Sequence, residues 1–258
     1  MTPPSIDPAQ FIAFCLILLR VSTILFLMPI FGSNLVPNEI KMAFALILSL
    51  ALLPVVKVNV DVFPTVLGGF IPLVLGELFM GLTLGMMARA VLESVQLAGQ
   101  YIGFQMGFAI ANVIDPQSGA QASVISQLAY IMATLIFLAL NGHHFILTAL
   151  VESFELAPAG SPLPNPIVFD TAVQSLANLF IIAIKIGAPT LALLFFAKVA
   201  MGIVSKTVPQ LNVLFVGMPL DIVLGLFLFG ISLSFFVAVF GQALSGLEKD
   251  IGTVLRAM

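Results

Sequence analysis

The sequence predicts an all-α, multi-pass membrane protein, and three observations carry that prediction. Of the 258 residues, 60% are hydrophobic and only 8% are charged, whereas soluble domains have about 25% charged residues. The mean hydropathy is +1.19. The apolar residues also gather in long runs separated by polar or proline-rich breaks. A water-soluble fold of this length cannot hide so much apolar surface, so membrane-embedded helices are expected.

About six apolar segments follow one another along the chain. A helix needs about 20 residues to cross the hydrocarbon core, so the second segment is short for a crossing. The third is expected to continue as an amphipathic helix towards Gly107, and the fifth is too long for one straight span, with Gly187 and Pro189 predicting a kink. Pro37 suits a turn or the first position of the second helix. The segments cover residues 10–31, 42–56, 66–92, 124–151, 172–204 and 213–240.

Two further stretches divide the chain. Residues 152–171 form the clearest linker, because prolines forbid a helix through it; it contains Pro158, Pro162, Pro164 and Pro166. The tail at residues 242–258 predicts an amphipathic helix that lies on a membrane or on a partner. Its apolar face is made of Leu244, Leu247, Ile251, Val254, Leu255 and Met258.

The stretch at residues 99–127 differs from its uniformly apolar surroundings. Gly99, Gly103 and Gly107 recur every fourth residue and would share one helical face, which allows another backbone to approach closely. Gly81 and Gly85 form a second such stripe. A polar turn follows and must lie in water or be enclosed by protein, so the stretch predicts a tightly packed helix that delivers a loop to a functional place. The polar turn contains Asn112, Asp115, Pro116, Gln117, Ser118 and Gly119.

Seven charged residues lie within or beside the apolar segments. Each charge at the centre of a membrane costs about 2.5–3.5 kcal/mol on insertion scales, so these helices are expected to pack mainly against protein, including other subunits. Structural ion pairing is the simpler interpretation and an ion-conducting role the alternative; Arg89 and Glu93 are four apart and could pair on one helix. The seven are Arg20, Glu77, Arg89, Glu93, Lys185, Lys198 and Asp221.

Several classes of function find no support in the sequence. There is no phosphate-binding loop, zinc-protease motif or nucleophile elbow, and the glycines spaced by four do not match a dinucleotide site. The adjacent His143 and His144 point in different directions on a helix, and the single Cys15 cannot form a disulfide within the chain. The net charge of −3 has no basic cluster for nucleic acid. We therefore expect no catalytic residues, metal site or cofactor.

Four blocks in the same order resemble one known family. They read PIFGSNLVPNEIKMAFAL at residues 29–46, GELFMGLTLGMMARAVLESVQLAGQYIGFQMGFAIANVIDPQSG at 76–119, NGHH at 141–144 and VPQLNVLFVGMPLDIVLG at 208–225. Together they make the chain similar to the flagellar biosynthetic protein FliR family, whose injectisome counterpart is usually called SctT. The resemblance is collinear over essentially the whole chain.

The resemblance implies a non-enzymatic subunit of the type III protein export gate. Family members assemble with FliP, FliQ and FlhB into a closed helical ring in the bacterial inner membrane, as part of the flagellar basal body, and unfolded flagellar subunits pass through its centre. It further implies a FliP-like unit at residues 1–151, the linker at 152–171 and a FliQ-like helical hairpin at 172–258. Lipids would be the remaining partner.

The family also places a plug loop in the pore, in the region that aligns with residues 104–119. Phe104, Met106, Phe108 and Ile110 could supply an apolar seal, since Met adapts its shape and neither residue type carries charge; ordinary core packing of Met106 and Phe108 is the alternative. The plug prediction covers Gly103, Phe104, Gln105, Met106, Gly107, Phe108, Ile110, Asn112, Asp115, Pro116, Gln117, Ser118 and Gly119.

A second set of residues is expected to pack against other subunits. Asp221 stands in VGMPLDIVLG where many relatives are expected to carry a lysine, so any pairing taken from the family is in doubt there. The set contains Arg20, Glu77, Gly81, Gly85, Arg89, Glu93, Gly99, Lys185, Lys198, Pro209, Gln210, Asn212 and Asp221.

Two other functions compete with an export gate. In a secondary transporter, the breaks at Gly187–Pro189 and Pro219–Asp221 would bind a solute at mid-membrane, although they do not recur at matching places in two halves. A non-conducting scaffold that nucleates the ring would never touch cargo.

Overall fold

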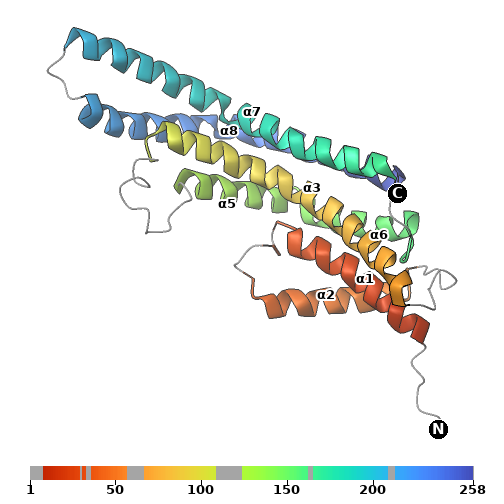
Figure 1. Ribbon diagram of the computed structural model, residues 1–258. Coiled ribbons are helices and arrows are strands. Elements are labelled where there is room, and N and C mark those ends of the chain that lie inside the picture. The colour runs from red at the N-terminus through yellow and green to blue at the C-terminus, as the bar shows by residue number, and fades with distance from the viewer. Residues whose placement is uncertain are drawn as a thin grey trace. The chain divides into compact units, whose positions relative to one another are not determined.

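The computed structural model describes residues 8–29, 31–32, 36–56, 67–108, 124–161, 165–208 and 213–257 (Figure 1). The elements in these ranges are helical, which confirms the predicted all-α class. They are α1 (Pro8–Leu27), α2 (Asn38–Leu52), the short 3₁₀ helix η2 (Leu67–Gly69), α3 (Phe70–Gln105), α5 (Val124–Ala139), α6 (Gly142–Leu156), α7 (Pro166–Thr207) and α8 (Val213–Ala257).

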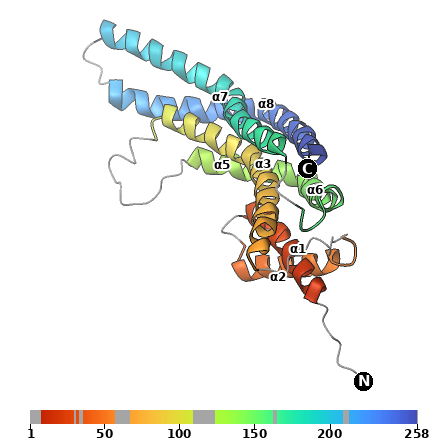
Figure 2. The ribbon, with the colours of Figure 1, turned by 45° about the vertical axis from the view of Figure 1, so that its right-hand side comes forward.

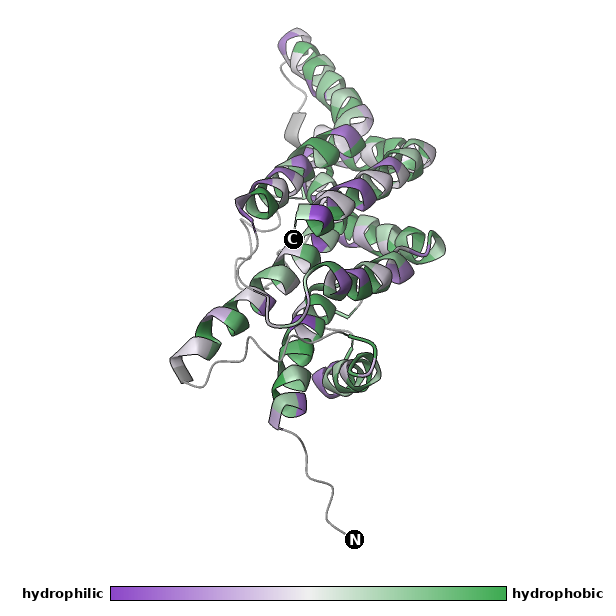
Figure 3. Ribbon diagram, turned by 90° about the vertical axis from the view of Figure 1, so that its right-hand side faces the viewer, coloured by the Kyte–Doolittle hydropathy of each residue, from purple (hydrophilic) through white to green (hydrophobic). Residues whose placement is uncertain are grey.

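Four of the described helices are long and apolar enough to cross a membrane: α1, α3, α7 and α8. Helices α5 and α6 form a pair bent by 65°, which raises the number to five if the pair is one span. Helix α2 has 15 residues and a length of about 22 Å, less than the roughly 30 Å hydrocarbon core. Figure 3 shows hydrophobic residues on all of these helices, with hydrophilic residues interspersed.

The chain forms two compact units, and each draws on separate parts of the sequence. Unit 1 consists of Met1–Ala90, Leu140–Leu176 and Gly246–Met258, and unit 2 of Val91–Ala139 and Ala177–Ser245. Helices α3, α7 and α8 each contribute to both units. The predicted likeness of residues 1–151 to FliP and of 172–258 to FliQ stays a prediction.

Unit 1 is built on close contacts between α1 and its neighbours. Helices α1 and α2 lie side by side (Figures 1 and 2). A Cβ added at Gly81 would lie 2.8 Å from Thr23 Cβ, and one at Gly85 would lie 2.7 Å from Leu27 Cβ. Both distances are too short for real side chains, so the glycines allow α3 to pack tightly on α1. The stripe thus packs closely within the chain, and its role in packing against other subunits stays a prediction.

Local sequence signals explain where several helices begin. Pro37 immediately precedes α2, as predicted. Asn165 Oδ1 accepts a hydrogen bond from the Ile167 N–H at 3.1 Å, and Pro166 is the first residue of α7. An Asn cap followed by Pro is a favoured helix start. The helix-free part of the linker is consequently shorter than the predicted 152–171, because α6 runs to Leu156 and α7 starts at Pro166.

One expectation about the last helices is corrected. The tail is not a separate surface helix, because α8 continues without a break from Val213 to Ala257. The apolar face was correctly predicted, but Leu247, Ile251 and Val254 are buried within the chain. The tail therefore packs on its own protein. Helix α7 continues through Gly187 and Pro189, and the kink predicted there stays a prediction.

Candidate functional site

The C-terminal part of α3 and the start of α5 flank the predicted plug loop, and both belong to unit 2. We call these two helical parts the legs of the central hairpin. A Cβ at Gly99 would lie 2.6 Å from Ser126 Cα and 3.1 Å from Ser126 N, so only glycine fits. The Ser126 hydroxyl donates to the Gln96 carbonyl oxygen at 3.1 Å. The two legs are thus fixed to each other, and the close approach predicted at Gly99 is confirmed.

Helix α3 ends in a glycine motif that stops it at a defined residue. The Phe108 N–H donates to the Gly103 carbonyl and the Gly107 N–H to the Phe104 carbonyl, both at 3.1 Å. Gly107 has φ of +91°, the left-handed conformation that this Schellman arrangement requires. Nothing in the described part of the chain lies within 4 Å of a Cβ at Gly107. The glycine stripe therefore stops before Gly107, which serves to end the helix.

The end of α3 is seated on α8 through Met106. This side chain is 0% exposed, and a Cβ at Gly225 would lie 2.5 Å from both Met106 Cγ and Met106 Cε. Gly225 thus leaves a space that the Met106 side chain fills. Phe104 has 53% of its surface exposed, and Phe108 is half-buried. Within the chain, Met106 has the core contact that was the alternative to a seal, and Phe104 remains available for one.

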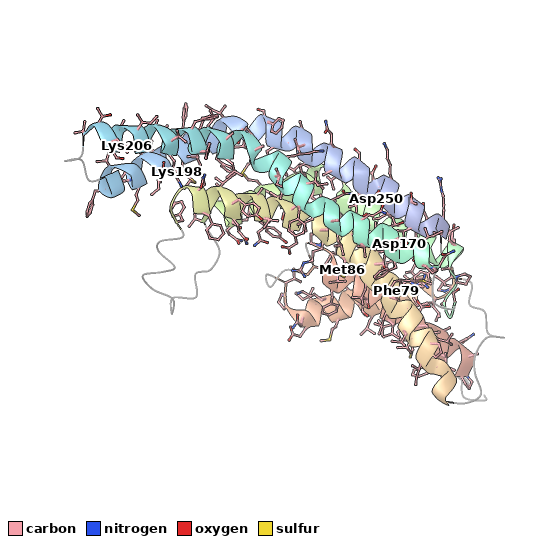
Figure 4. All side chains as sticks on the ribbon, turned by 45° about the horizontal axis from the view of Figure 1, so that its top comes forward. Phe79, Met86, Asp170, Lys198, Lys206 and Asp250 are labelled. Carbon is pink, nitrogen blue, oxygen red and sulfur yellow. The ribbon has the colours of Figure 1, made fainter. Side chains whose placement is uncertain are left out.

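A polar cluster adjoins this seat. Lys198, on α7 (Figure 4), donates from Nζ to Gln105 Oε1 at 3.3 Å. Asp221 lies on α8, four residues before Gly225. Asp221 Oδ1 is buried and has no hydrogen-bond partner among the described residues. In the part of the chain that the structure describes, no direct ion pair joins Lys198 to Asp221. We call Gln105, Lys198 and Asp221 the root cluster.

Unit 1 holds a second polar centre around Arg20, which is 0% exposed. Arg20 Nε donates to Glu77 Oε2 at 2.6 Å. Arg20 Nη1 donates to the carbonyl oxygens of Ser153 and Ala157, each at 2.9 Å. These carbonyls belong to the C-terminal end of α6, where a positive charge complements the helix dipole and free carbonyls need donors. One arginine therefore joins α1 to α3 and to the end of α6.

The same centre fixes the segment after α6. Glu77 Oε1 accepts a hydrogen bond from the Gly160 N–H at 2.9 Å, and Gly160 has a left-handed φ of +88°. The Arg20 guanidinium also lies over the Phe154 ring, 4.2 Å from its centroid. The two charges thus neutralise each other inside the protein, as buried charges require, while Arg20 Nη2 is buried without a hydrogen-bond partner among the described residues.

The remaining predicted residues have varied positions. Lys185 is exposed on α7, and Arg89 and Glu93 each have an interaction partner. Gly103 is buried near the end of α3. The roles of these residues in subunit packing stay predictions. The described ranges do not include Ile110, Asn112, Asp115, Pro116, Gln117, Ser118, Gly119, Pro209, Gln210 and Asn212.

Three partnerships were missed from the sequence. The Arg20–Glu77 pair spans 57 positions, and opposite charges in the middle of two apolar segments were the available signal. The sequence indicated only part of two other contacts, those of Met106 with Gly225 and of Ser126 with Gly99. A glycine inside a helix suggests a close approach but does not identify the partner.

Comparison with known proteins defines the class. Residues 11–247 match the family described as "Bacterial export proteins, family 1", and the chain belongs to this family of membrane export proteins. The chain is 39% identical to the flagellar biosynthetic protein FliR of Bacillus subtilis over 220 residues, 82% of each chain. It is 32% identical to FliR of Aquifex aeolicus over 220 residues, 83% of this chain and 82% of the relative. Identity to FliR of Escherichia coli is 29% over 212 residues, 81% of this chain and 79% of the relative.

These matches confirm the predicted FliR-family membership. The chain is accordingly a non-enzymatic, multi-pass membrane component of the flagellar export apparatus.

Proposed function

We propose that this chain lines the export channel in the bacterial inner membrane and that residues 104–119 close it between transport events. The observation that carries the proposal is the way the chain supports this segment. The α3 leg is locked to α5 at Gly99 and Ser126, and Met106 is seated on Gly225 of α8. A closing element must be held against a rigid scaffold, and these contacts supply one on both sides.

The chemistry of the segment suits a deformable seal. Phe104 is exposed beside the buried Met106, and Phe108 and Ile110 follow on the same stretch of chain. A hydrophobic constriction blocks water and ions by excluding water from the pore. The polar turn at Asp115–Ser118 then gives the segment a hydrophilic tip. Unfolded export substrates would displace this segment without any covalent chemistry.

The partners we propose are FliP, FliQ and FlhB-type subunits together with lipid. In the most hydrophobic windows of α7 and α8, only 28% and 17% of the residues are buried within the chain. Large apolar side chains such as Phe196, Phe227 and Ile231 are more than half exposed. So large an apolar surface is unfavourable in contact with water, and neighbouring helices of a ring would cover it.

The decisive experiment removes the seal and leaves its supports. We would replace Phe104, Phe108 and Ile110 with Ser in the assembled complex, reconstitute it into liposomes and measure release of a small dye. The expected result is a rise in dye release of at least about tenfold, because a polar constriction stays hydrated. A second variant lacking residues 109–119 should leak as much or more.

The matched control replaces the polar residues Asn112, Gln117 and Ser118 with Ala, which keeps the length and the apolar residues of the segment. Dye release from this control should stay at the level of the unaltered complex. If the Ser variant and the deletion both assemble with unchanged permeability, the closing role is excluded and the scaffold hypothesis gains. Saturable uptake of a small solute by the isolated chain would instead support a secondary transporter.

A further inference from the structure

We propose that the outward face of α7 around Lys185 docks a helix of a neighbouring membrane subunit, and that this helix carries an aspartate or glutamate opposite the Lys185 ammonium group. The inference rests on the part of the proposed function that places this chain among other subunits. It does not depend on the closing role of residues 104–119. It adds the chemistry by which one neighbour is recognised.

The first step is the position of Lys185 within α7. A membrane crossing needs about 20 residues, and every stretch of that length in Pro166–Thr207 contains Lys185 or Lys198. Lys198 belongs to the root cluster, where Gln105 accepts its hydrogen bond at 3.3 Å. Lys185 is exposed, and it has no hydrogen-bond or ion-pair partner among the residues that the structure describes. Of these two cations, Lys185 is therefore the one that needs a partner.

The second step is the direction in which Lys185 faces. One side of α7 packs on its own chain, where Thr190 Oγ1 donates to Ser232 Oγ of α8 at 3.3 Å. That buried side contains Ala183, Ile186, Thr190 and Leu194. Exposed residues follow one another at steps of three or four on the other side and thus form one stripe. We call this set the outer stripe, and it contains Asn178, Ile181, Lys185, Ala188 and Ala192.

The third step is the composition of the outer stripe, all of which belongs to unit 2. It combines an amide and an ammonium group with two alanines, and Ile181 is 52% exposed between the two polar residues. Polar side chains in membrane segments almost always face protein. Alanines allow a second helix to approach closely, and asparagine hydrogen-bonds across such contacts. The outer stripe therefore has the composition of a contact between helices and not of a surface that faces acyl chains.

The fourth step is charge complementarity. An ammonium group surrounded by apolar side chains needs a negative partner, and α7 contains no acidic residue from Thr171 to Thr207. A lipid phosphate would meet the charge alone. A helix with a carboxylate would meet the charge and also cover Asn178, Ala188 and Ala192. The occupant that fits the whole stripe is thus an apolar helix with one acidic residue.

The main experiment reverses the charge of Lys185 in the tagged full-length chain, expressed together with the other membrane subunits of the export apparatus. Native electrophoresis measures how much of the chain enters the complex. K185E should lower this yield by at least about tenfold, because two negative charges would then meet. K185R keeps the charge and should lower the yield by less than about twofold.

The matched control is K206E, which makes the same change at an exposed lysine between Ser205 and Thr207 at the end of α7. Its yield should stay within about twofold of the unaltered chain, since a charge beside polar residues is hydrated. The isolated K185E chain should unfold in detergent at the same denaturant concentration as the unaltered chain, because Lys185 has no internal partner among the described residues. A shift of that midpoint would give Lys185 an internal role and overturn the inference.

A second measurement identifies the occupant. Photoreactive benzoylphenylalanine in place of Ile181 should give, on irradiation of the membranes, an adduct with a protein segment that is apolar and contains an aspartate or glutamate. Changing that carboxylate to lysine should restore the complex of the K185E chain. An adduct with lipid alone, or a complex that the charge exchange does not restore, overturns the inference.

The outcomes separate the inference from the closing role. If K185E assembles normally, or if K185E and K206E lose the same yield, the docking inference is overturned, and a leaking deletion of residues 109–119 still supports the closing role. If K185E alone loses the complex and charge exchange restores it, the inference holds even where the deletion does not leak.

Discussion

The two units differ in how many contacts their charged residues make. In unit 1, Arg20 and Glu77 bond each other, and together they bond backbone groups of Ser153, Ala157 and Gly160. In unit 2, Lys198 bonds a neutral amide, and Asp221 keeps one buried oxygen without a partner among the described residues. A highly connected ion pair specifies a single arrangement, whereas an incompletely connected one leaves a second arrangement open. Arg20 Nη2 is also buried without a hydrogen-bond partner among the described residues, so the difference between the units lies in the number of contacts that each charged group makes.

The long helices show a parallel contrast in burial. In their most hydrophobic windows, 39% of α1 and 50% of α3 are buried within the chain, against 28% of α7 and 17% of α8. Helices α1 and α3 therefore find much of their packing internally, through contacts such as Gly81 on Thr23. Helices α7 and α8 depend on lipid or on other subunits for most of theirs. The incompletely paired charges of Lys198 and Asp221 also lie on α7 and α8.

The largest expected effect tests the contrast between the two charge clusters. Glu77→Ala leaves Arg20 buried without its counter-charge and frees the Gly160 N–H, so we expect a loss of about 3–5 kcal/mol in the free energy of unfolding. Asp221→Ala removes a carboxylate that has an unpaired oxygen and should change that free energy by less than about 1 kcal/mol. Denaturant unfolding in detergent micelles compares the two variants.

The double variant Arg20→Met with Glu77→Leu sharpens this comparison. Replacing both charges with apolar residues of similar volume removes the unpaired charge, so it should be less destabilising than Glu77→Ala alone. Equal losses in the Glu77→Ala and Asp221→Ala variants would show that the two clusters do not differ as the contacts indicate.

An intermediate effect is expected from two glycines of unit 2. Gly99→Ala places a Cβ 2.6 Å from the Ser126 backbone, and because backbone cannot rotate away, we expect about 1–3 kcal/mol of destabilisation. Gly230→Ala is the matched control, since nothing among the described residues lies within 4 Å of its Cβ. Alanine should stabilise α8 there by about 0.5–1 kcal/mol. Opposite shifts in the melting temperature check both; a shift of the same sign would refute the close contact.

Composition and periodicity predicted the fold class and most helices correctly. An 8% share of charged residues cannot belong to a soluble domain of this size, and helix is the structure that satisfies backbone groups in lipid. Proline and asparagine signals also located the starts of α2 and α7. These features depend on local chemistry, which the sequence states directly.

Long-range partners were beyond the reach of the sequence. Arg20 and Glu77 are 57 positions apart, and nothing local selects Glu77 over the other carboxylates as the partner. The tail was misjudged for the same reason: its apolar face is visible in the sequence, but whether Leu247 and Ile251 meet lipid or their own chain depends on tertiary packing. Gly107 shows the converse error, because a spacing of four suggested a continued helical face where the backbone takes a left-handed turn.

The smallest expected effect concerns Asn141, at the bend of 65° between α5 and α6. This residue has a left-handed φ of 57° and makes no side-chain cap hydrogen bond, so we expect its contribution to come from its backbone conformation. Asparagine tolerates this region better than alanine, and glycine better still. Asn141→Ala should therefore cost about 1 kcal/mol, while Asn141→Gly should change the free energy of unfolding by less than about 0.5 kcal/mol. Unfolding in micelles distinguishes the two variants; equal losses for both would mean that the Asn141 side chain has an energetic role and that the bend is not set by backbone conformation.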